Sequence, residues 1–298
     1  MNDHKRQDFR LLHPLRVRWG EVDLQRIVFN PHYLSYIDIA FTEYWRALAV
    51  PYESIPAMLG GDLFVKKSTL EYHGSAQLDD QLTIGLRCAR IGKSSMLFHG
   101  GIFRGEIHLV SSELVYVFAD PVRRAPLPVP DALREIVHSF EAGQSQVDVL
   151  LGTWEELGAQ AGALRKSVFG DELQIAAALD FDASDPAAQH VLVRSRLGQA
   201  LATGRISFES PGVARLARLV VLRAMRSAGF GRIALQTLLD AAAARGASRV
   251  LLLSQQSAEG FYRSLGFAPI AEPVMEAGVP HVEMARALQP DQTSSSSA

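Results

Sequence analysis

The sequence has a single cysteine, no long apolar run and no marked excess of either charge, and each absence narrows what the protein can be. Because Cys88 has no second cysteine to pair with, no disulfide can form within one chain, which favours a reducing compartment. The net charge of −2 gives no basic footprint for nucleic acid. Neither a membrane helix nor a signal-peptide core is apparent. We therefore expect a soluble cytoplasmic protein without nucleic-acid or membrane partners.

The 298 residues are enough for two domains, and 48% hydrophobic residues are enough for packed cores. The two halves differ in pattern and show no internal repeat, so we expect a fusion of unrelated domains. The predicted organisation is an N-terminal tail over 1–13, a first domain over 14–140, a linker over 141–148, a second domain over 149–288 and a disordered tail over 289–298.

The first half predicts one long buried helix and several strands. Alternating residues indicate a strand over 15–19. Pro31 suits the first turn of a helix, with Asn30 as its N-cap, and this helix is apolar nearly all round. A central helix with an antiparallel sheet around it is an α+β architecture. The further predicted strands cover 64–72, 82–90, 95–103 and 107–118.

Asp23 lies between the first strand and this helix, and the residues alone leave two interpretations open. The start of a buried helix presents free N–H groups and the positive end of the helix dipole, which can stabilise an oxyanion. A carboxylate just upstream could attack a carbonyl bound there or activate a water molecule. Alternatively, Asp23 only satisfies the loop that enters the helix.

A longer pattern favours the catalytic interpretation. Glu21-x-Asp23, the segment 27–30 and the helix that carries Glu43 and Arg46 resemble the 4-hydroxybenzoyl-CoA thioesterase family of hotdog-fold enzymes. The stretches LEYHGSAQLDDQLTI and PLPVPDALREIV match later parts of that family. The resemblance covers roughly residues 14–140, which is the whole first domain.

This resemblance implies a hotdog fold and hydrolysis of acyl-CoA thioesters. It implies that Asp23 is the catalytic acid and that the backbone N–H of Asn30 polarises the thioester carbonyl. It also implies a homodimer or higher homo-oligomer, with sites formed across the subunit interface. The family usually has a small residue where this chain has Arg26, so the choice of acyl group depends on what Arg26 does.

In the second half, RSAGFG at residues 226–231 follows an apolar strand near 219–222 and precedes an Ala-rich helix. Small residues let backbone N–H groups approach a phosphate, and the helix dipole favours the anion. The turn is not a Walker loop, because no Lys-Ser/Thr pair follows, and it lacks the third glycine of the dinucleotide fingerprint. A plain tight turn is the alternative. The order of helices and strands around it is that of an α/β domain.

The pattern R-x-x-G-x-G after LARLVVL is similar to the acetyl-CoA-binding motif of the GNAT acetyltransferases, and residues 254–267 resemble their second motif. By this resemblance Tyr262 protonates the departing CoA thiolate, a role that suits a phenol because it stays protonated at neutral pH. Alternatively, Tyr262 packs in the core. The CoA-binding residues that the resemblance implies are Leu222, Arg226, Ser227, Ala228, Gly229, Phe230, Gly231 and Arg232.

Within the GNAT superfamily, residues 150–288 resemble the ElaA-like branch. The resemblance rests on MEAGVPHVEM, on Ser254-Gln255, and on LRKSVF followed by Asp180-x-Asp182. It implies that Glu276 and His281 lie near the acceptor end.

Together these observations predict a bifunctional enzyme that hydrolyses an acyl-CoA and transfers acetyl from acetyl-CoA to an unidentified amine. We expect no tightly bound cofactor and no metal site. In an alternative, the GNAT-like half only binds CoA, as a regulatory or assembly module. Leu173 and Ala176 depart from the usual ElaA-like pattern and motivate that alternative. A non-enzymatic scaffold would need neither Asp23 nor the glycine-rich turn.

Overall fold

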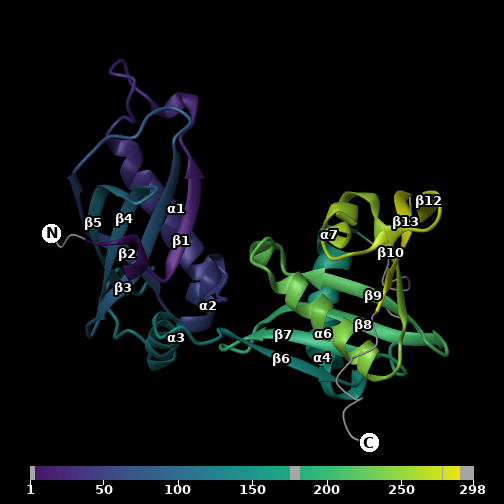
Figure 1. Ribbon diagram of the computed structural model, residues 1–298. Coiled ribbons are helices and arrows are strands. Elements are labelled where there is room, and N and C mark those ends of the chain that lie inside the picture. Colours follow the sequence, from purple (N-terminus) through teal and green to yellow (C-terminus); the bar gives the residue numbers. More distant parts are fainter. Residues whose placement is uncertain (1–3, 175–181, 277, 289–298) are drawn as a thin grey trace, which may run out of the picture. The chain divides into compact units, whose positions relative to one another are not determined.

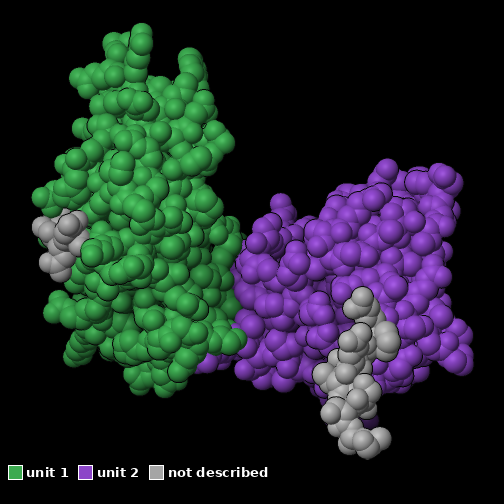
Figure 2. Space-filling model, in the orientation of Figure 1, with its two compact units in different colours: residues 1–146 green, residues 147–298 purple. Residues whose placement is uncertain are grey.

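The computed structural model describes residues 4–174, 182–276 and 278–288, and the chain divides into two compact units (Figures 1 and 2). The first unit ends at Gln146 and the second begins at Val147. This division falls within the linker expected over 141–148, although the last helix of the first unit reaches Glu141 and the first strand of the second starts at Val147. The tail expected over 289–298 lies outside the described residues.

Five antiparallel strands wrap around one long helix in the first unit (Figure 1). Helix α1 (Pro31–Ala47) buries Tyr33, Ile37 and Tyr44, as its broad apolar stripe predicts. Two shorter helices, α2 (Ile55–Leu59) and α3 (Asp131–Glu141), complete the unit. The strand order is β1-β3-β4-β5-β2. The strands are β1 (Leu11–Arg16), β2 (Asp62–Tyr72), β3 (Gln81–Ile91), β4 (Ser95–Arg104) and β5 (Ile107–Ala119), and the last four lie close to their predicted ranges.

The N-terminal segment is part of the fold, because a strand begins within the tail expected over 1–13. Strand β1 begins at Leu11, and Phe9 is buried against the sheet. A Cβ on Gly85 would lie 2.5 Å from the Phe9 ring, so this contact requires glycine at that position. The sequence does not predict that Phe9 is buried, because its nearest neighbours are polar and a single apolar residue has no periodicity.

The strand predicted over 15–19 is also displaced, because β1 ends at Arg16 and residues 19–21 form a 3-10 turn. The Glu21 carboxylate accepts the backbone N–H of Arg18 at 2.8 Å, and the Glu21 N–H donates to the Arg18 carbonyl at 3.0 Å. These two hydrogen bonds curl the chain before a ladder can form.

The second unit is built on an eight-stranded sheet with the order β11-β13-β10-β9-β8-β7-β6, and β12 pairs with β13 (Figure 1). The α-helices among its described residues are α4 (Trp154–Arg165), α6 (Phe230–Ala244) and α7 (Glu259–Arg263). The strands are β6 (Val147–Gly152), β7 (Gln189–Ser195), β8 (Ala200–Ser210), β9 (Val213–Val221), β10 (Arg249–Gln255), β11 (Ala268–Pro269), β12 (Val274–Glu276) and β13 (Val279–Ala287).

The sheet is mixed, and its one parallel pair among the described strands creates an opening. Strands β9 and β10 pair from Val213 with Arg249 to Leu216 with Leu252, after which both strands continue without pairing to each other. A bulge in β9 at Arg218, whose φ is 55°, coincides with this separation. The carboxyl ends of the two strands therefore diverge beside the turn that carries RSAGFG.

Helix α4 ends at Arg165, and a π-helical turn over 166–172 continues it. Thr153 starts α4 as its N-cap, since its side chain accepts the N–H of Glu156. Within the described ranges, no helix is both long enough and apolar enough to span a bilayer.

Candidate active sites

Asp23 begins a tight turn that leads the chain back toward α1. Its N–H donates to the Ile27 carbonyl at 2.9 Å, and its own carbonyl accepts the N–H of Arg26 at 2.9 Å. Its carboxylate Oδ1 accepts the N–H of Gln25 at 2.7 Å, while no described residue donates a hydrogen bond to Oδ2. Asp23 thus supports the loop with one oxygen and leaves the other available, so the geometry is compatible with both interpretations of this residue.

Arg26 closes this turn in the left-handed conformation, with φ of 63°. Its side chain is exposed, and no described residue forms an ion pair with it. The preference for a small residue here therefore has a backbone reason, because only glycine adopts this conformation without strain.

Asn30 immediately precedes α1, and it follows by two residues the bridge that Val28 forms with Val22, the neighbour of Asp23. Among the described residues, nothing accepts a hydrogen bond from the Asn30 N–H. The predicted side-chain cap is absent, because Asn30 is in the α conformation and its side chain accepts no N–H from the first turn. What Asn30 offers a ligand is therefore its backbone N–H.

Glu21, the other acid of the pair, is buried and holds this loop against α1. Its Oε2 accepts the Tyr36 hydroxyl at 2.7 Å, and its Oε1 accepts the Nε of Arg18 at 2.7 Å. Burial alone would raise the pKa of Glu21, but the hydrogen bonds from Arg18 and Tyr36 outweigh it and hold the pKa below its usual value. Glu21 is therefore a charged structural anchor under the loop that carries Asp23.

A hollow of about 280 Å³ lies beside the first turns of α1. Its wall combines apolar side chains with two serines, one carboxylate and one phenol. The lining residues are Pro31, Leu34, Ser35 and Asp38 of α1, Val65 and Ser68 of β2, and Leu114 and Tyr116 of β5. An acyl group whose carbonyl is bound at the Asn30 N–H would have this hollow next to it.

In the second unit, the turn between β9 and α6 leaves a row of backbone N–H groups without partners. Ser227 and Gly229 have φ values of 65° and 91°, and Gly229 is the N-cap of α6. The N–H groups of residues 227–232 donate to no described residue. Successive N–H groups at the start of a fifteen-residue helix form a site for a pyrophosphate.

Arg226 and Leu222 frame this turn from the strand side. The guanidinium of Arg226 forms two 2.7 Å hydrogen bonds with the Glu172 carboxylate. The Leu222 N–H donates to the Leu201 carbonyl at 2.8 Å, so its backbone belongs to the sheet rather than to the free row.

Tyr262 lies on α7 and is 9% exposed. Its ring packs against Phe261 and Phe267, with centroid distances of 5.1 and 5.9 Å. Burial raises the pKa of Tyr262 to about 12, so the phenol is protonated at neutral pH. No described residue forms a hydrogen bond with its hydroxyl. Tyr262 therefore has the packing of a core residue and the uncommitted hydroxyl of a proton donor.

Of the motif Asp180-x-Asp182, the structure describes Asp182, which has a structural role. Asp182 accepts hydrogen bonds from Arg205 at 2.6 Å and Arg218 at 2.9 Å, and the hydrogen bond from Arg205 contributes most to lowering its pKa. Asp180 and Ala176 lie outside the described residues. At the expected acceptor end, Glu276 is exposed on β12, and His281 pairs with Val274 in the β12–β13 hairpin.

Comparison with known proteins connects these sites to two families. A family model described as acetyltransferase (GNAT) domain matches residues 173–288. The chain is 33% identical over 131 residues to the uncharacterized N-acetyltransferase YjcF of Bacillus subtilis, a match that covers 44% of this chain and 92% of that protein. The second unit is a GNAT domain. Escherichia coli ElaA is a similar solved structure, with 26% identity, a TM-score of 0.43 and coverage of 47% of this chain and 99% of that one.

The first unit belongs to the thioesterase superfamily, whose model matches residues 25–111. The chain is 27% identical over 121 residues to the acyl-CoA thioester hydrolase YbgC of Escherichia coli O157:H7, which covers 40% of this chain and 90% of that protein. The predictions of a hotdog domain and a GNAT domain in one chain are confirmed. Because the matched residues begin two positions after Asp23, the role of that carboxylate stays a prediction.

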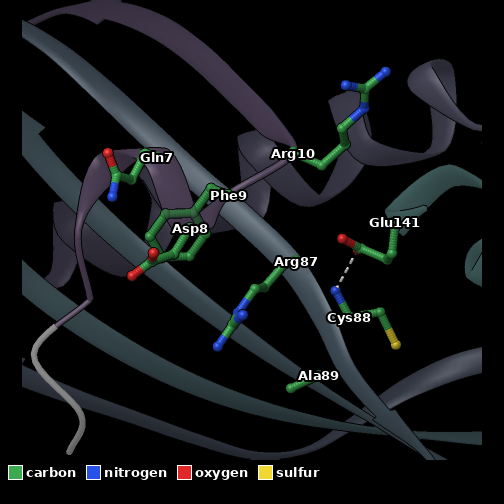
Figure 3. Close-up of a pocket in the computed structure, with 8 residues that line it drawn as sticks. All are labelled: Gln7, Asp8, Phe9, Arg10, Arg87, Cys88, Ala89 and Glu141. Carbon is green, nitrogen blue, oxygen red and sulfur yellow. Dashed lines mark hydrogen bonds between the residues drawn. The ribbon is translucent and has the colours of Figure 1, made fainter. Parts of the chain in front are cut away.

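A further hollow, of about 480 Å³, lies in the hotdog domain on the edge of β3 that β1 leaves uncovered (Figure 3). Glu141 lines it, and its Oε1 accepts the Tyr44 hydroxyl at 2.6 Å and the Cys88 N–H at 2.7 Å. Figure 3 shows Arg10 and Arg87 pointing in different directions around it. Sequence reasoning missed this network, because its members are more than forty residues apart in the chain.

Proposed function

We propose that the protein is a bifunctional CoA-thioester enzyme. The hotdog domain hydrolyses an acyl-CoA, and the GNAT domain transfers an acetyl group from acetyl-CoA to an amine. The observation that supports this most is the unpaired state of the N–H groups at both sites, at Asn30 and at residues 227–232. Unpaired N–H groups at a helix start are costly unless a ligand or water uses them.

In the proposed hydrolysis, the Asn30 N–H stabilises the oxyanion that forms as the thioester carbonyl is attacked. The Asp23 Oδ2 either attacks the carbonyl carbon, giving an anhydride that water then hydrolyses, or takes a proton from the attacking water. The CoA thiolate leaves in both cases. The likeness to YbgC, a protein named as an acyl-CoA thioester hydrolase, supports this reaction class.

The Asp23→Asn substitution tests this step, because asparagine keeps the Oδ1 that supports the loop but removes the basic oxygen. We expect the rate of thiol release from a panel of short, long and aromatic acyl-CoAs to fall by about 10²-fold or more. Asp131→Asn is the matched control, since Asp131 is an exposed carboxylate of the same domain. Equal hydrolysis by wild type and Asp23→Asn would return Asp23 to a role in the loop alone.

In the proposed acetyl transfer, the pyrophosphate of acetyl-CoA is bound by the N–H groups of residues 227–232, and the pantetheine arm enters the opening between β9 and β10. The amine attacks the acetyl carbonyl, and the CoA sulfur leaves with the proton of the Tyr262 hydroxyl. The proton that the amine loses passes through water to the Tyr262 oxygen and restores the phenol.

Tyr262→Phe tests the proton donor, because phenylalanine preserves the packing with Phe267 and removes only the hydroxyl. We expect kcat for acetylation of an amine panel to fall by about 10²-fold while the Kd of acetyl-CoA is unchanged. Phe261→Leu serves as the packing control. If wild type binds acetyl-CoA but acetylates no amine, the GNAT domain is a CoA-binding regulatory or assembly module.

We also propose that the hotdog domain associates into a homodimer. Strand β2 is an edge of the sheet and carries exposed Phe64, Val65 and Tyr72. An exposed apolar edge strand is usually covered by another chain. Analytical ultracentrifugation of the full chain should give a dimer, and a monomer at the concentrations used for the assay would contradict this proposal.

A further inference from the structure

Glu172 is joined to the first residue of the glycine-rich turn by a two-point ion pair. Both Glu172 carboxylate oxygens accept 2.7 Å hydrogen bonds from Arg226, one from each terminal nitrogen of the guanidinium. The Nε of Arg226 also donates to the Val221 carbonyl at 3.3 Å. All three guanidinium nitrogens of Arg226 therefore form hydrogen bonds that fix its side chain. A bidentate pair between arginine and a carboxylate also defines the orientation of the guanidinium.

The π-helical turn that carries Glu172 packs against β9, the strand that leads to Arg226. Glu172 ends the π-helical turn over 166–172, and Val168 of that turn is buried with Leu164 and with Val220 of β9. Leu222, at the end of β9, packs against this cluster. The carboxylate thus belongs to a packed element, whereas Arg226 directly precedes residues 227–232, whose N–H groups have no partners in the described chain.

We propose that Glu172 is a positioning residue for CoA binding, acting through Arg226 on the N–H groups of residues 227–232. The turn needs such support, because Ser227 holds a left-handed conformation with φ of 65°, which is unfavourable for a residue other than glycine. By fixing Arg226, Glu172 keeps the turn in the conformation in which its N–H groups converge. This inference rests on the proposed binding of CoA by the GNAT domain.

The proposal is testable because simple electrostatics predicts the opposite sign. A carboxylate near a pyrophosphate site repels the ligand, so removing it should tighten CoA binding if repulsion were its main effect. If Glu172 positions the turn, removing Glu172 should weaken CoA binding, because part of the binding free energy is then needed to order the turn. Glu172→Ala therefore distinguishes the two effects by the direction in which Kd changes.

The experiment measures the Kd of CoA by titration calorimetry on the full chain for wild type, Glu172→Ala, Arg226→Ala and the double variant, and Gly229→Val, which blocks the GNAT turn, gives the binding that belongs to the hotdog domain alone. We expect Glu172→Ala to raise Kd about five- to tenfold and to leave kcat at saturating acetyl-CoA within twofold. In the Arg226→Ala background, Glu172→Ala should have no further effect, since Glu172 acts through Arg226. Glu209→Ala removes a different ion pair of the same domain, with Arg215, and should leave Kd unchanged.

An unchanged or lower Kd in Glu172→Ala would overturn the proposal, as would an effect that persists in the Arg226→Ala background. If Glu172 only stabilised the fold, the melting temperature would fall without a change in Kd, which also counts against a positioning role. Wild-type binding of CoA that equals the binding by Gly229→Val would instead refute the proposed function of the GNAT domain, and the two failures are distinguishable.

Discussion

Arg26 adopts a backbone conformation that is unfavourable for arginine but is required by the turn in which it lies. The turn from Asp23 to Arg26 requires φ of 63° at its last position, and arginine adopts this conformation less readily than glycine. We expect Arg26→Gly to stabilise the hotdog domain by about 0.5–1 kcal/mol. Scanning calorimetry of the full chain would measure this, with Arg90→Gly in β3 as a control that should destabilise. A lower stability of Arg26→Gly would mean that the arginine side chain makes a favourable contact.

Glu141 links stability to pH in a direction that is unusual for a carboxylate. Burial raises the pKa of Glu141 above its ordinary value of 4.5, and the hydrogen bonds from Tyr44 and Cys88 only partly offset this. A group whose pKa is raised by folding stabilises the fold when protonated, so its contribution is lost as pH rises above about 4.5 through the raised pKa.

The Glu141→Gln variant isolates this effect, because glutamine does not titrate and still accepts hydrogen bonds. We expect the free energy of unfolding of wild type to decline relative to Glu141→Gln as pH rises from about 4.5 to neutrality. Urea titrations across this range measure the difference. A difference that does not vary with pH would show that folding does not shift the pKa of Glu141.

At the scale of elements, buried ion pairs hold α4 to β8 in the GNAT domain. Asp185 accepts hydrogen bonds from Arg165 of α4 at 2.8 and 3.2 Å and forms a further ion pair with Arg205 of β8. All three residues are buried. Burial would raise the pKa of Asp185, but the two arginines outweigh it and lower the pKa. This carboxylate therefore stabilises the fold at neutral pH and ceases to do so as pH falls through the lowered pKa.

Asp185→Asn should destabilise the GNAT domain by roughly 3 kcal/mol, because the buried guanidinium of Arg165 loses its charged partner, whereas that of Arg205 keeps Asp182. Asp148→Asn is the control, since the pair between Asp148 and Arg194 is partly exposed and should contribute less than about 1 kcal/mol. Scanning calorimetry of the full chain measures both. Equal effects would show that burial does not govern the strength of the Asp185 pairs.

At the scale of the whole molecule, each unit contains the elements of its own proposed site. Asp23 and Asn30 lie in residues 1–146, and the glycine-rich turn and Tyr262 lie in residues 147–298. We therefore expect Asp23→Asn to leave acetyl transfer within twofold of wild type. Gly229→Val, which places a β-branched side chain at φ of 91°, should abolish CoA binding by the GNAT domain and leave hydrolysis unchanged. Loss of both activities in either variant would reveal coupling between the domains.

The sequence by itself determined the elements whose evidence is local. The broad apolar stripe of α1, the strand alternation around Leu82 to Cys88 and the spacing of RSAGFG between a strand and a helix all depend on residues that are close in the chain. Such patterns are readable because helix and strand periods place neighbouring residues on one face. For the same reason the two families were recognisable from ordered motifs.

Only the tertiary structure decided which distant residues meet. It places Phe9 on Gly85, Glu141 against Tyr44, and Glu172 on Arg226. No periodicity specifies such partners, because a long-range contact depends on how whole elements pack rather than on local preference. The partners of Asp23 and Asn30 are of the same kind. The sequence indicates the acid and the start of the helix. That the Asp23 Oδ2 and the Asn30 N–H have no hydrogen-bond partner among the described residues depends on the tertiary structure around them.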